Sequence, residues 1–294
     1  MLEMIADTTD QFVDFCPFVP CIDAQGNVAF QARLRTGQTG VFHSDGAELF
    51  LADGDVAAVI SHPAWVRSQV TFYAALQSGG TALATGKGGV LTEHRNVGPL
   101  GPTTNTAGDI AFRADDAIWV YQAGACREVA RIGDRYIEFH GLPVATEDGR
   151  VVFRADLNDG SAVILRECEI IHQTNGELGR FPCVNALGHV AFAVPNGIFV
   201  AKPEHEPVGM LKGPYTFRGA LVGNADAVVA IATPHGGQLG IYADHNRLIG
   251  IGDQFLGSEV VDFALNPVSI NTVGDMAIRI KLANDIQAIV RWNR

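Results

Sequence analysis

A short apolar run that recurs about every 40 residues dominates the hydrophobic pattern of this chain. The run usually consists of two small residues followed by phenylalanine. Its seven copies begin at residues 28, 70, 110, 151, 190, 228 and 276, so successive copies lie 42, 40, 41, 39, 38 and 48 residues apart. Strand-like runs at this period are typical of β-propeller blades, and the 3.6-residue periodicity of helical repeats is absent.

Two kinds of turn residue precede the runs at fixed distances. Five glycines stand two residues before a run: Gly26, Gly108, Gly149, Gly188 and Gly274. Four Asx residues stand five residues before a run: Asp23, Asn105, Asn185 and Asn271. A tight turn between two strands requires an Asx side chain that bonds its own backbone and a glycine that adopts positive φ. Each run is therefore predicted to be a strand that follows such a turn.

The last repeat is incomplete, and the start of the chain supplies what it lacks. Segments for a third strand follow all seven runs, but the seventh has no room for a fourth strand before Arg294. Residues 2–7 resemble the fourth-strand segments at 49–53 and 248–253. We therefore predict an all-β fold: a seven-bladed β-propeller with four-stranded blades, forming one domain over residues 1–294. Residues 2–7 complete the blade made by residues 263–294, because the ring would otherwise open on unpaired backbone groups.

The turn and strand motif resembles that of a known family. The pattern N-x-x-G-x-x-x-F is intact from Asn105 to Phe112 and from Asn185 to Phe192. It resembles the repeat of bacterial tandem-repeat β-propeller proteins that are named for this motif, and the resemblance covers nearly the whole chain. It implies the propeller architecture and no particular activity. Members of that family are often secreted with a surface anchor.

Composition narrows the classes of partner and compartment. The formal net charge of −11 argues against nucleic acid or an anionic membrane surface as a partner, because phosphate binding needs a basic patch. No apolar stretch approaches the roughly 18 residues that span a bilayer. The N-terminal segment lacks the basic and apolar regions of a secretory signal, and the five cysteines do not form a disulfide framework. We therefore predict a cytoplasmic protein.

The predicted site is one mouth of the central channel. Taking the strand before each turn as innermost, we expect a proline, or Gly219 in the sixth blade, to begin that strand, since no ladder N–H is needed there. The loops that lead into these strands would then form the mouth. Candidate ligand-binding residues near these loops are Trp65, Arg67, Arg95, Tyr136, Arg180, Tyr215, Arg218 and Asp262.

Three histidines from successive leading loops are candidate metal ligands. His62, His94 and His140, with Glu138 nearby, would suit one divalent metal ion that activates water or polarises a carbonyl. The alternative is that they are separate, hydrogen-bonded loop histidines. Cys16 is a candidate nucleophile, but no partner histidine is implied close to it.

Arginine occupies the position after the repeat phenylalanine in three blades, as Arg113, Arg154 and Arg279. Strand alternation places this position on the opposite face from the phenylalanine, which favours packing between blades. A ring of cations that binds a carboxylate ligand is the alternative.

Two functions stay open at this point. The first is a propeller that binds a small molecule or a protein partner at the predicted mouth. The second is a cytoplasmic hydrolase or lyase in which Glu138 and His140 act as acid and base. No phosphate loop, nucleophile elbow or dinucleotide fingerprint is present. The segment 252–267 would serve either as a lid or as a contact surface for a partner.

Overall fold

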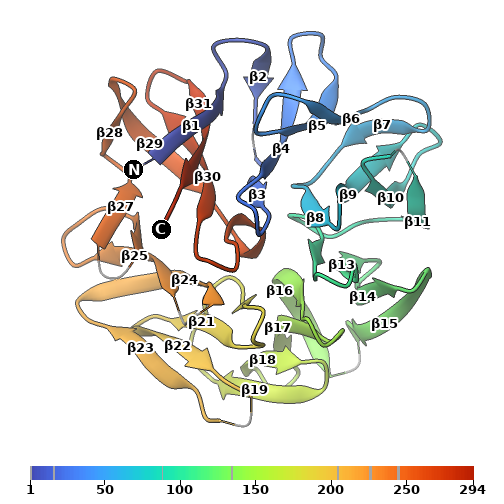
Figure 1. Ribbon diagram of the computed structural model, residues 1–294. Helices are drawn as coiled ribbons and strands as arrows, with labels where there is room; N and C mark the ends of the chain where they lie inside the picture. Colours follow the sequence, from blue (N-terminus) through green and yellow to red (C-terminus); the bar gives the residue numbers. More distant parts are fainter. Residues whose placement is uncertain are drawn as a thin grey trace.

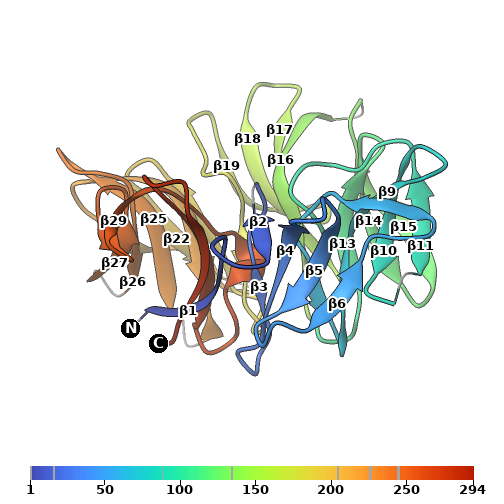
Figure 2. The same ribbon diagram turned by 90° about the horizontal axis from the view of Figure 1, so that it is seen from above.

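Seven antiparallel sheets surround a central axis and form the blades of a β-propeller (Figure 1). The computed structural model describes residues 2–15, 17–87, 89–133, 135–203, 205–224, 227–243 and 246–294. The predicted all-β, seven-bladed fold is confirmed. Figure 2 shows the ring from the side, with both chain termini at the same blade.

The first three blades follow the predicted order from the innermost to the outermost strand. Blade 1 contains β2 (Phe12–Asp14), β3 (Cys21–Ile22), β4 (Val28–Leu34), β5 (Thr39–His43) and β6 (Glu48–Leu51). Blade 2 contains β7 (Val56–Val59), β8 (Ala64–Val66), β9 (Gln69–Leu76), β10 (Thr81–Thr85) and β11 (Val90–His94). Blade 3 contains β12 (Thr103–Thr104), β13 (Ile110–Ala114), β14 (Ala117–Gln122) and β15 (Ala125–Arg131).

The remaining blades repeat this order. Blade 4 contains β16 (Tyr136–Ala145), β17 (Val151–Leu157), β18 (Ala162–Arg166) and β19 (Glu169–Thr174). Blade 5 contains β20 (Cys183–Val184), β21 (Val190–Val194), β22 (Gly197–Ala201) and β23 (Val208–Lys212). Blade 6 contains β24 (Tyr215–Val222), β25 (Val228–Pro234), β26 (Gly240–Ala243) and β27 (Asn246–Gly250). Blade 7 contains β28 (Gln254–Phe255), β29 (Ser258–Ala264), the 3₁₀ helix η2 (Pro267–Ser269), β30 (Met276–Leu282), β31 (Gln287–Trp292) and β1 (Leu2–Asp7).

The N-terminal strand closes the ring as predicted. β1 pairs antiparallel with β31, from Leu2 opposite Trp292 to Asp7 opposite Ala288. An ion pair between Arg291 Nη2 and Glu3 Oε2, 2.6 Å apart, lies on the same seam. Blade 7 therefore obtains its outermost strand from the other end of the chain.

In blades 3 and 5 the innermost strands β12 and β20 begin directly after Pro102 and Pro182, as predicted, but in the other blades the innermost strand begins earlier. In blade 2, β7 already pairs with β9 before Pro63, and β16 and β24 run through Pro143 and Gly219. The prediction that these residues begin the strand is therefore wrong. The hydrogen-bond ladder is interrupted near Pro143 and Gly219, by register shifts between His140 and Val144 in β16 and between Phe217 and Gly219 in β24. The strand nevertheless continues on both sides of each interruption.

Because these strands start earlier than predicted, several candidate site residues lie on strands and not on loops. Tyr136, Glu138 and His140 lie on β16, Tyr215 and Arg218 lie on β24, and Asp262 lies on β29. Blade 7 also begins before residue 263, because β29 starts at Ser258 and pairs with β28 in a hairpin. Residues 254–264 are thus an extension of the innermost strand of this blade.

The hydrophobic core lies between neighbouring blades. The repeat phenylalanines are at most 1% exposed, and each packs against the preceding blade: Phe30, Phe72, Phe112, Phe153 and Phe192. The following residue faces the next blade. The Tyr73 hydroxyl accepts a hydrogen bond from the Arg113 N–H, and Arg113 Nη1 donates to the Gly141 carbonyl. The contacts of Arg113 support the prediction of packing between blades.

The asparagine of the repeat motif joins neighbouring blades. In Asn105, Asn185 and Asn271 the side-chain oxygen accepts backbone N–H groups of its own turn. The Nδ2 group donates to a carbonyl at the equivalent position of the next blade, at Thr146 (2.8 Å), Gly223 (3.0 Å) and Asp23 (3.1 Å) respectively. One side chain therefore caps a turn and holds two blades together.

Deleting residues 2–7 is expected to lower the free energy of unfolding by several kcal/mol or to prevent folding, because the β1–β31 ladder and the ring seam are lost. Thermal melts of the shortened and full-length chains test this. Removing residues 293–294, which lie beyond β31, serves as the control and should change the melting temperature little. A chain without residues 2–7 that melts at the wild-type temperature would refute the closing role of β1.

Asn185→Asp is expected to destabilise the fold by about 1–3 kcal/mol, because the carboxylate still caps its turn but leaves the buried Gly223 carbonyl without its donor. Urea denaturation measures the change. Asn284→Asp is the matched control, since the exposed Asn284 accepts a turn N–H and donates to no described residue. Equal stability of the two variants would show that the bond between blades contributes nothing.

Candidate functional site

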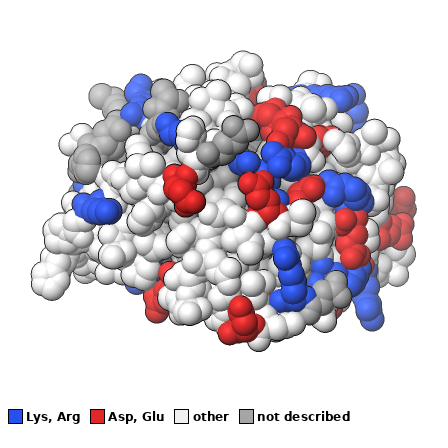
Figure 3. All heavy atoms as spheres, turned by 90° about the horizontal axis from the view of Figure 1, so that it is seen from below, with Lys and Arg blue, Asp and Glu red and all other residues white. Residues whose placement is uncertain are grey.

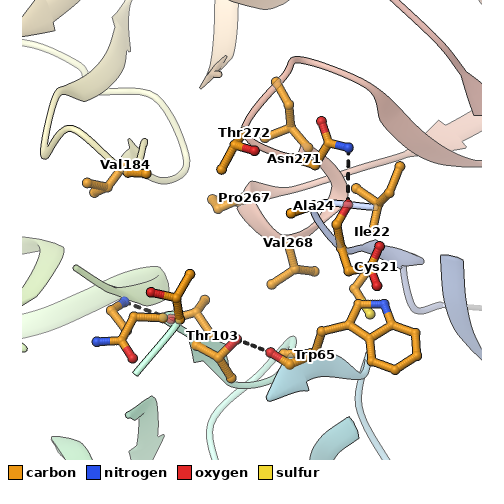
Figure 4. A pocket seen from close by; sticks show the side chains of 18 of the residues that line it. Cys21, Ile22, Ala24, Trp65, Thr103, Val184, Pro267, Val268, Asn271 and Thr272 are labelled. Atoms are coloured by element: carbon orange, nitrogen blue, oxygen red, sulfur yellow. Dashed lines mark hydrogen bonds between the residues drawn. The ribbon is translucent and has the colours of Figure 1, made fainter. Parts of the chain in front are cut away.

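A cavity occupies the central channel at the end where the innermost strands turn back. It has a volume of about 330 Å³ and is lined by residues of all seven blades. Figure 4 shows lining side chains from several blades around it, among them Cys21, Trp65, Thr103 and Val184. The cavity lies at the opposite end of the channel from the predicted mouth.

Most polar groups in the cavity wall bind other parts of the wall. The Thr103 hydroxyl donates to the Pro143 carbonyl, 2.8 Å away, and accepts the Ala145 N–H. The Thr104 hydroxyl bonds the Trp65 carbonyl, and Asn105 bridges to Thr146. These residues were not predicted as site residues. The sequence could have identified them, because they are the motif asparagine and the two residues before it, at the end of the innermost strand.

Trp65 and Arg67 lie at this cavity and not on a leading loop. Trp65 is on β8, and its indole Nε1 donates to the Asn27 carbonyl of blade 1 at 3.2 Å. Arg67 follows β8 in the turn with a φ of 55°, and its Nη2 donates to the Ala107 carbonyl of blade 3 at 2.7 Å. Their predicted position is therefore wrong, because the innermost strand of blade 2 starts before His62.

The charged side chains around the cavity are hydrogen-bonded to neutral groups of the wall. Arg67 is the cation of the lining, and Asp23 and Glu147 are its carboxylates. Asp23 accepts the Gln25 and Asn27 N–H groups, and Glu147 accepts the N–H and hydroxyl of Thr106. Two carboxylates and one guanidinium give the described lining a formal charge of −1, which disfavours an anionic ligand.

The buried thiols are inert. Cys21 lines the cavity, and burial raises the pKa of its thiol far above the ordinary value. Burial also raises the pKa of Cys183 to about 12. A thiol with a raised pKa is a weak nucleophile at neutral pH. Cys16, the predicted candidate nucleophile, lies outside the described residues.

The three histidines predicted to share a metal ion do not meet. His62 is buried between blades: its Nε2 lies 3.1 Å from the Pro102 carbonyl and its Nδ1 lies 3.3 Å from Asn266 Nδ2. Since a carbonyl only accepts, Nε2 carries the proton and Nδ1 is the acceptor. His94 is on β11, the outermost strand of blade 2, with Nδ1 3.0 Å from Asp115 Oδ2. Neither imidazole is available as part of a shared site, so that ligand set is wrong.

His140 instead joins two carboxylates. Its Nε2 lies 2.8 Å from Asp156 Oδ2 and 3.8 Å from Glu138 Oε2. Within the part of the chain that the structure describes, this is the one group of three or more His, Cys, Asp or Glu residues whose ligand atoms lie within 4.8 Å of one another. The predicted acid and base, Glu138 and His140, are thus neighbours on β16, and the sequence did not identify Asp156 as their partner.

The other predicted ligand-binding residues do not converge on the cavity. Tyr136 is buried and packs on Phe139 and Phe153, which makes it a core residue. Tyr215 packs on Phe217 and Tyr242. Four are exposed and do not line it: Arg95, Arg180, Arg218 and Asp262. Asp262 Oδ2 accepts a hydrogen bond from Arg279 Nη2 at 3.0 Å.

The outer surface carries both signs of charge. Acidic and basic side chains intermix on the face shown in Figure 3 and do not separate into a basic patch. Ion pairs also join neighbouring blades, for example Arg127 with Glu167 at 2.7 Å. Among the described residues no helix is long and apolar enough to cross a membrane.

Comparisons with known proteins support the fold alone. A scan against family models and a search of curated proteins find no match. Among solved structures, the β-propeller domain of Cps50 (Swd1) from Myceliophteria thermophila superposes with a TM-score of 0.58 at 12% identity, covering 97% of this chain and 99% of that one. The WD40 propeller domain of Doa1 gives a TM-score of 0.45 at 10% identity, covering 100% and 98%. Membership of the N-x-x-G-x-x-x-F family stays a prediction.

The neutral state of His62 makes the stability of the fold depend on pH. Burial lowers the pKa of His62 to about 4, below the ordinary value of 6.5. The unfolded chain therefore binds this proton first, and stability is lost as the pH falls from about 6.5 towards 4. His62→Gln keeps a donor for Pro102 without a titrating group. We expect the drop in unfolding free energy from pH 7.5 to 4.5 to be roughly 2–3 kcal/mol smaller in this variant. Equal drops, measured by urea denaturation, would contradict the neutral assignment.

Proposed function

We propose that this chain is a binding propeller whose ligand is a small, uncharged polar molecule held in the channel cavity at the turn end. The observation that carries the proposal is a cavity of about 330 Å³ to which all seven blades contribute. Its volume is at the lower end of the range for small-molecule sites, about 300–1,000 Å³.

The free groups of the wall support this class of ligand. The Thr272 hydroxyl and the Gln25 amide line the cavity, and neither side chain bonds another described residue. Apolar contact area comes from Ile22, Val184 and Val268. Arg67, Asp23 and Glu147 already use hydrogen-bonding groups on neutral partners in the wall, so we assign recognition to the uncharged groups, and a neutral polyol or amide fits these best.

The mouth at the leading loops is the other position for a ligand. Arg180 and Arg218 are exposed there on neighbouring blades, and the Arg180 N–H donates to the Arg218 carbonyl at 3.3 Å. This mouth stays a prediction for an anionic ligand or for a protein partner. The cavity is preferred because its walls enclose a volume that a small molecule can fill. A cytoplasmic location also stays a prediction.

An enzyme is the second candidate function, and a different observation favours it. Glu138, His140 and Asp156 form a compact acid–base group on the leading-loop side of blade 4. Such a group could move protons in a hydrolase or lyase, but it does not line the channel cavity. The two candidates therefore depend on separate parts of the chain and can be tested separately.

Thr272→Trp is expected to abolish binding, because the indole fills the cavity, whereas Val273→Trp is expected to have no effect. Val273 is the next residue of the same turn, is 59% exposed and does not line the cavity. Neutral polyols, sugars and amides are first screened for those that raise the melting temperature of the wild-type chain. A ligand at about 100 times its dissociation constant adds about 2.7 kcal/mol of stability. Hits that stabilise Thr272→Trp as well as wild type would overturn the position of the site, and a screen without hits would overturn the ligand class.

A further inference from the structure

The geometry points to a divalent metal site, formed by Glu138, His140 and Asp156 at the leading-loop end of blade 4, with Zn²⁺ as the ion that suits its ligands. This inference is independent of the proposed binding function, because none of the three residues lines the channel cavity. It replaces the predicted set of three histidines with one imidazole and two carboxylates.

Strand pairing brings the three ligands to one face of the blade. Glu138 on β16 lies directly opposite Asp156 on β17, and His140 follows two residues after Glu138. Residues at i and i+2 of a strand share a face, so all three side chains project in the same direction. Their ligand atoms lie within 4.8 Å of one another, close enough for one ion to reach all three with small side-chain rotations.

One imidazole and two carboxylates favour a metal ion of intermediate softness, such as Zn²⁺. Zn²⁺ binds imidazole nitrogen and carboxylate oxygen at about 2.0–2.2 Å, and three protein ligands leave a fourth position for water. Ca²⁺ and Mg²⁺ prefer all-oxygen sites, so the imidazole discriminates against them. The Nε2 atom that would bind the ion now lies 2.8 Å from Asp156 Oδ2, and this spacing would widen to roughly 3.4 Å around a tetrahedral Zn²⁺ ion.

The polar network around the group is incomplete. Asp156 Oδ1 is buried and has no hydrogen-bond partner among the described residues, and the same holds for Arg154 Nε. Glu138 is 62% exposed and makes no hydrogen bond to a described residue. A buried oxygen without a partner is costly and calls for an additional group. A bound ion with its water supplies one.

Two arginines oppose cation binding and set the charge balance. Arg154 Nη2 lies 3.9 Å from Asp156 Oδ1, and the charges of Arg113 and Arg154 both act on Glu138. Their hydrogen bonds, however, go to backbone carbonyls towards the next blade: Gly141 for Arg113, and Leu178 and Gly179 for Arg154. These backbone carbonyls hold the guanidinium groups of both arginines in place.

Close packing against blade 5 restricts the backbone of the strand that carries Glu138 and His140. Gly141, directly after His140, has a φ of 62°, and a Cβ atom there would lie 2.5 Å from the Arg180 carbonyl oxygen. Blade 5 therefore packs closely against the strand at this point, which fixes the direction of β16 as it leaves the site. Ligands on paired strands need little reorganisation to bind an ion.

The test is calorimetric titration of Zn²⁺ into the untagged full-length chain at neutral pH. We expect one saturable site per chain, and at least about a tenfold loss of affinity in His140→Ala and in Glu138→Gln. Glu138 is exposed, so Glu138→Gln should fold normally even if His140→Ala does not; thermal melts check this. His43→Ala is the matched control, because His43 also pairs with a carboxylate, Asp45 at 2.8 Å, but has no third ligand.

Exposed thiols could bind Zn²⁺ elsewhere, namely at Cys126 and Cys168. Co²⁺ used as a spectroscopic probe separates the two cases, since a thiolate ligand adds a charge-transfer band that nitrogen and oxygen ligands lack. Binding that weakens in folded Glu138→Gln, is unchanged in His43→Ala and shows no thiolate band supports the inference. Absence of saturable binding, equal affinity in Glu138→Gln and wild type, or a thiolate band would overturn it.

Discussion

Closure of the ring by β1 is the constraint on which the rest of this structure depends. Each blade buries its apolar faces only against its two neighbours, as the position of the repeat phenylalanines shows. An open ring would expose two blade faces and the edge of β31 at once. Pairing β1 with β31 places the two ends of the chain in one sheet, so that the last blade and the first become neighbours.

The hydrogen bonds between blades also determine what the channel can bind. Thr103, Asn105, Asn185 and Asn271 line the cavity, and their side chains are committed to contacts with the next blade. These groups stiffen the wall but leave few donors and acceptors for a ligand. The cavity lining therefore contains many polar residues, but few of their side chains can form hydrogen bonds with a ligand. The same side chains explain why the motif asparagine recurs without implying an activity.

The two ends of the channel differ in chemistry because a register shift divides an innermost strand such as β16 into two halves with different residues. On β16 the first half carries Glu138 and His140, and the second half contributes Val144 and Ala145 to the cavity. The register shift between His140 and Val144, with Gly141 at positive φ, separates the two halves. One strand thus takes part in an acid–base group at one end and in an apolar wall at the other.

The sequence by itself determined the number of blades, the positions of the turns and the closure by residues 2–7. These follow from local signals: the period near 40 residues, the Asx and glycine spacing and the incomplete seventh repeat. Only the tertiary structure decided which end of the channel holds a cavity and which histidine meets carboxylates. Those properties depend on contacts between residues about 40 positions apart, such as Asn105 with Thr146, and on bulges near Pro143 and Gly219 that shift the strand starts. A local sequence pattern predicts each strand and turn. It does not predict these contacts or bulges, because they depend on which side chains the neighbouring blades bring together.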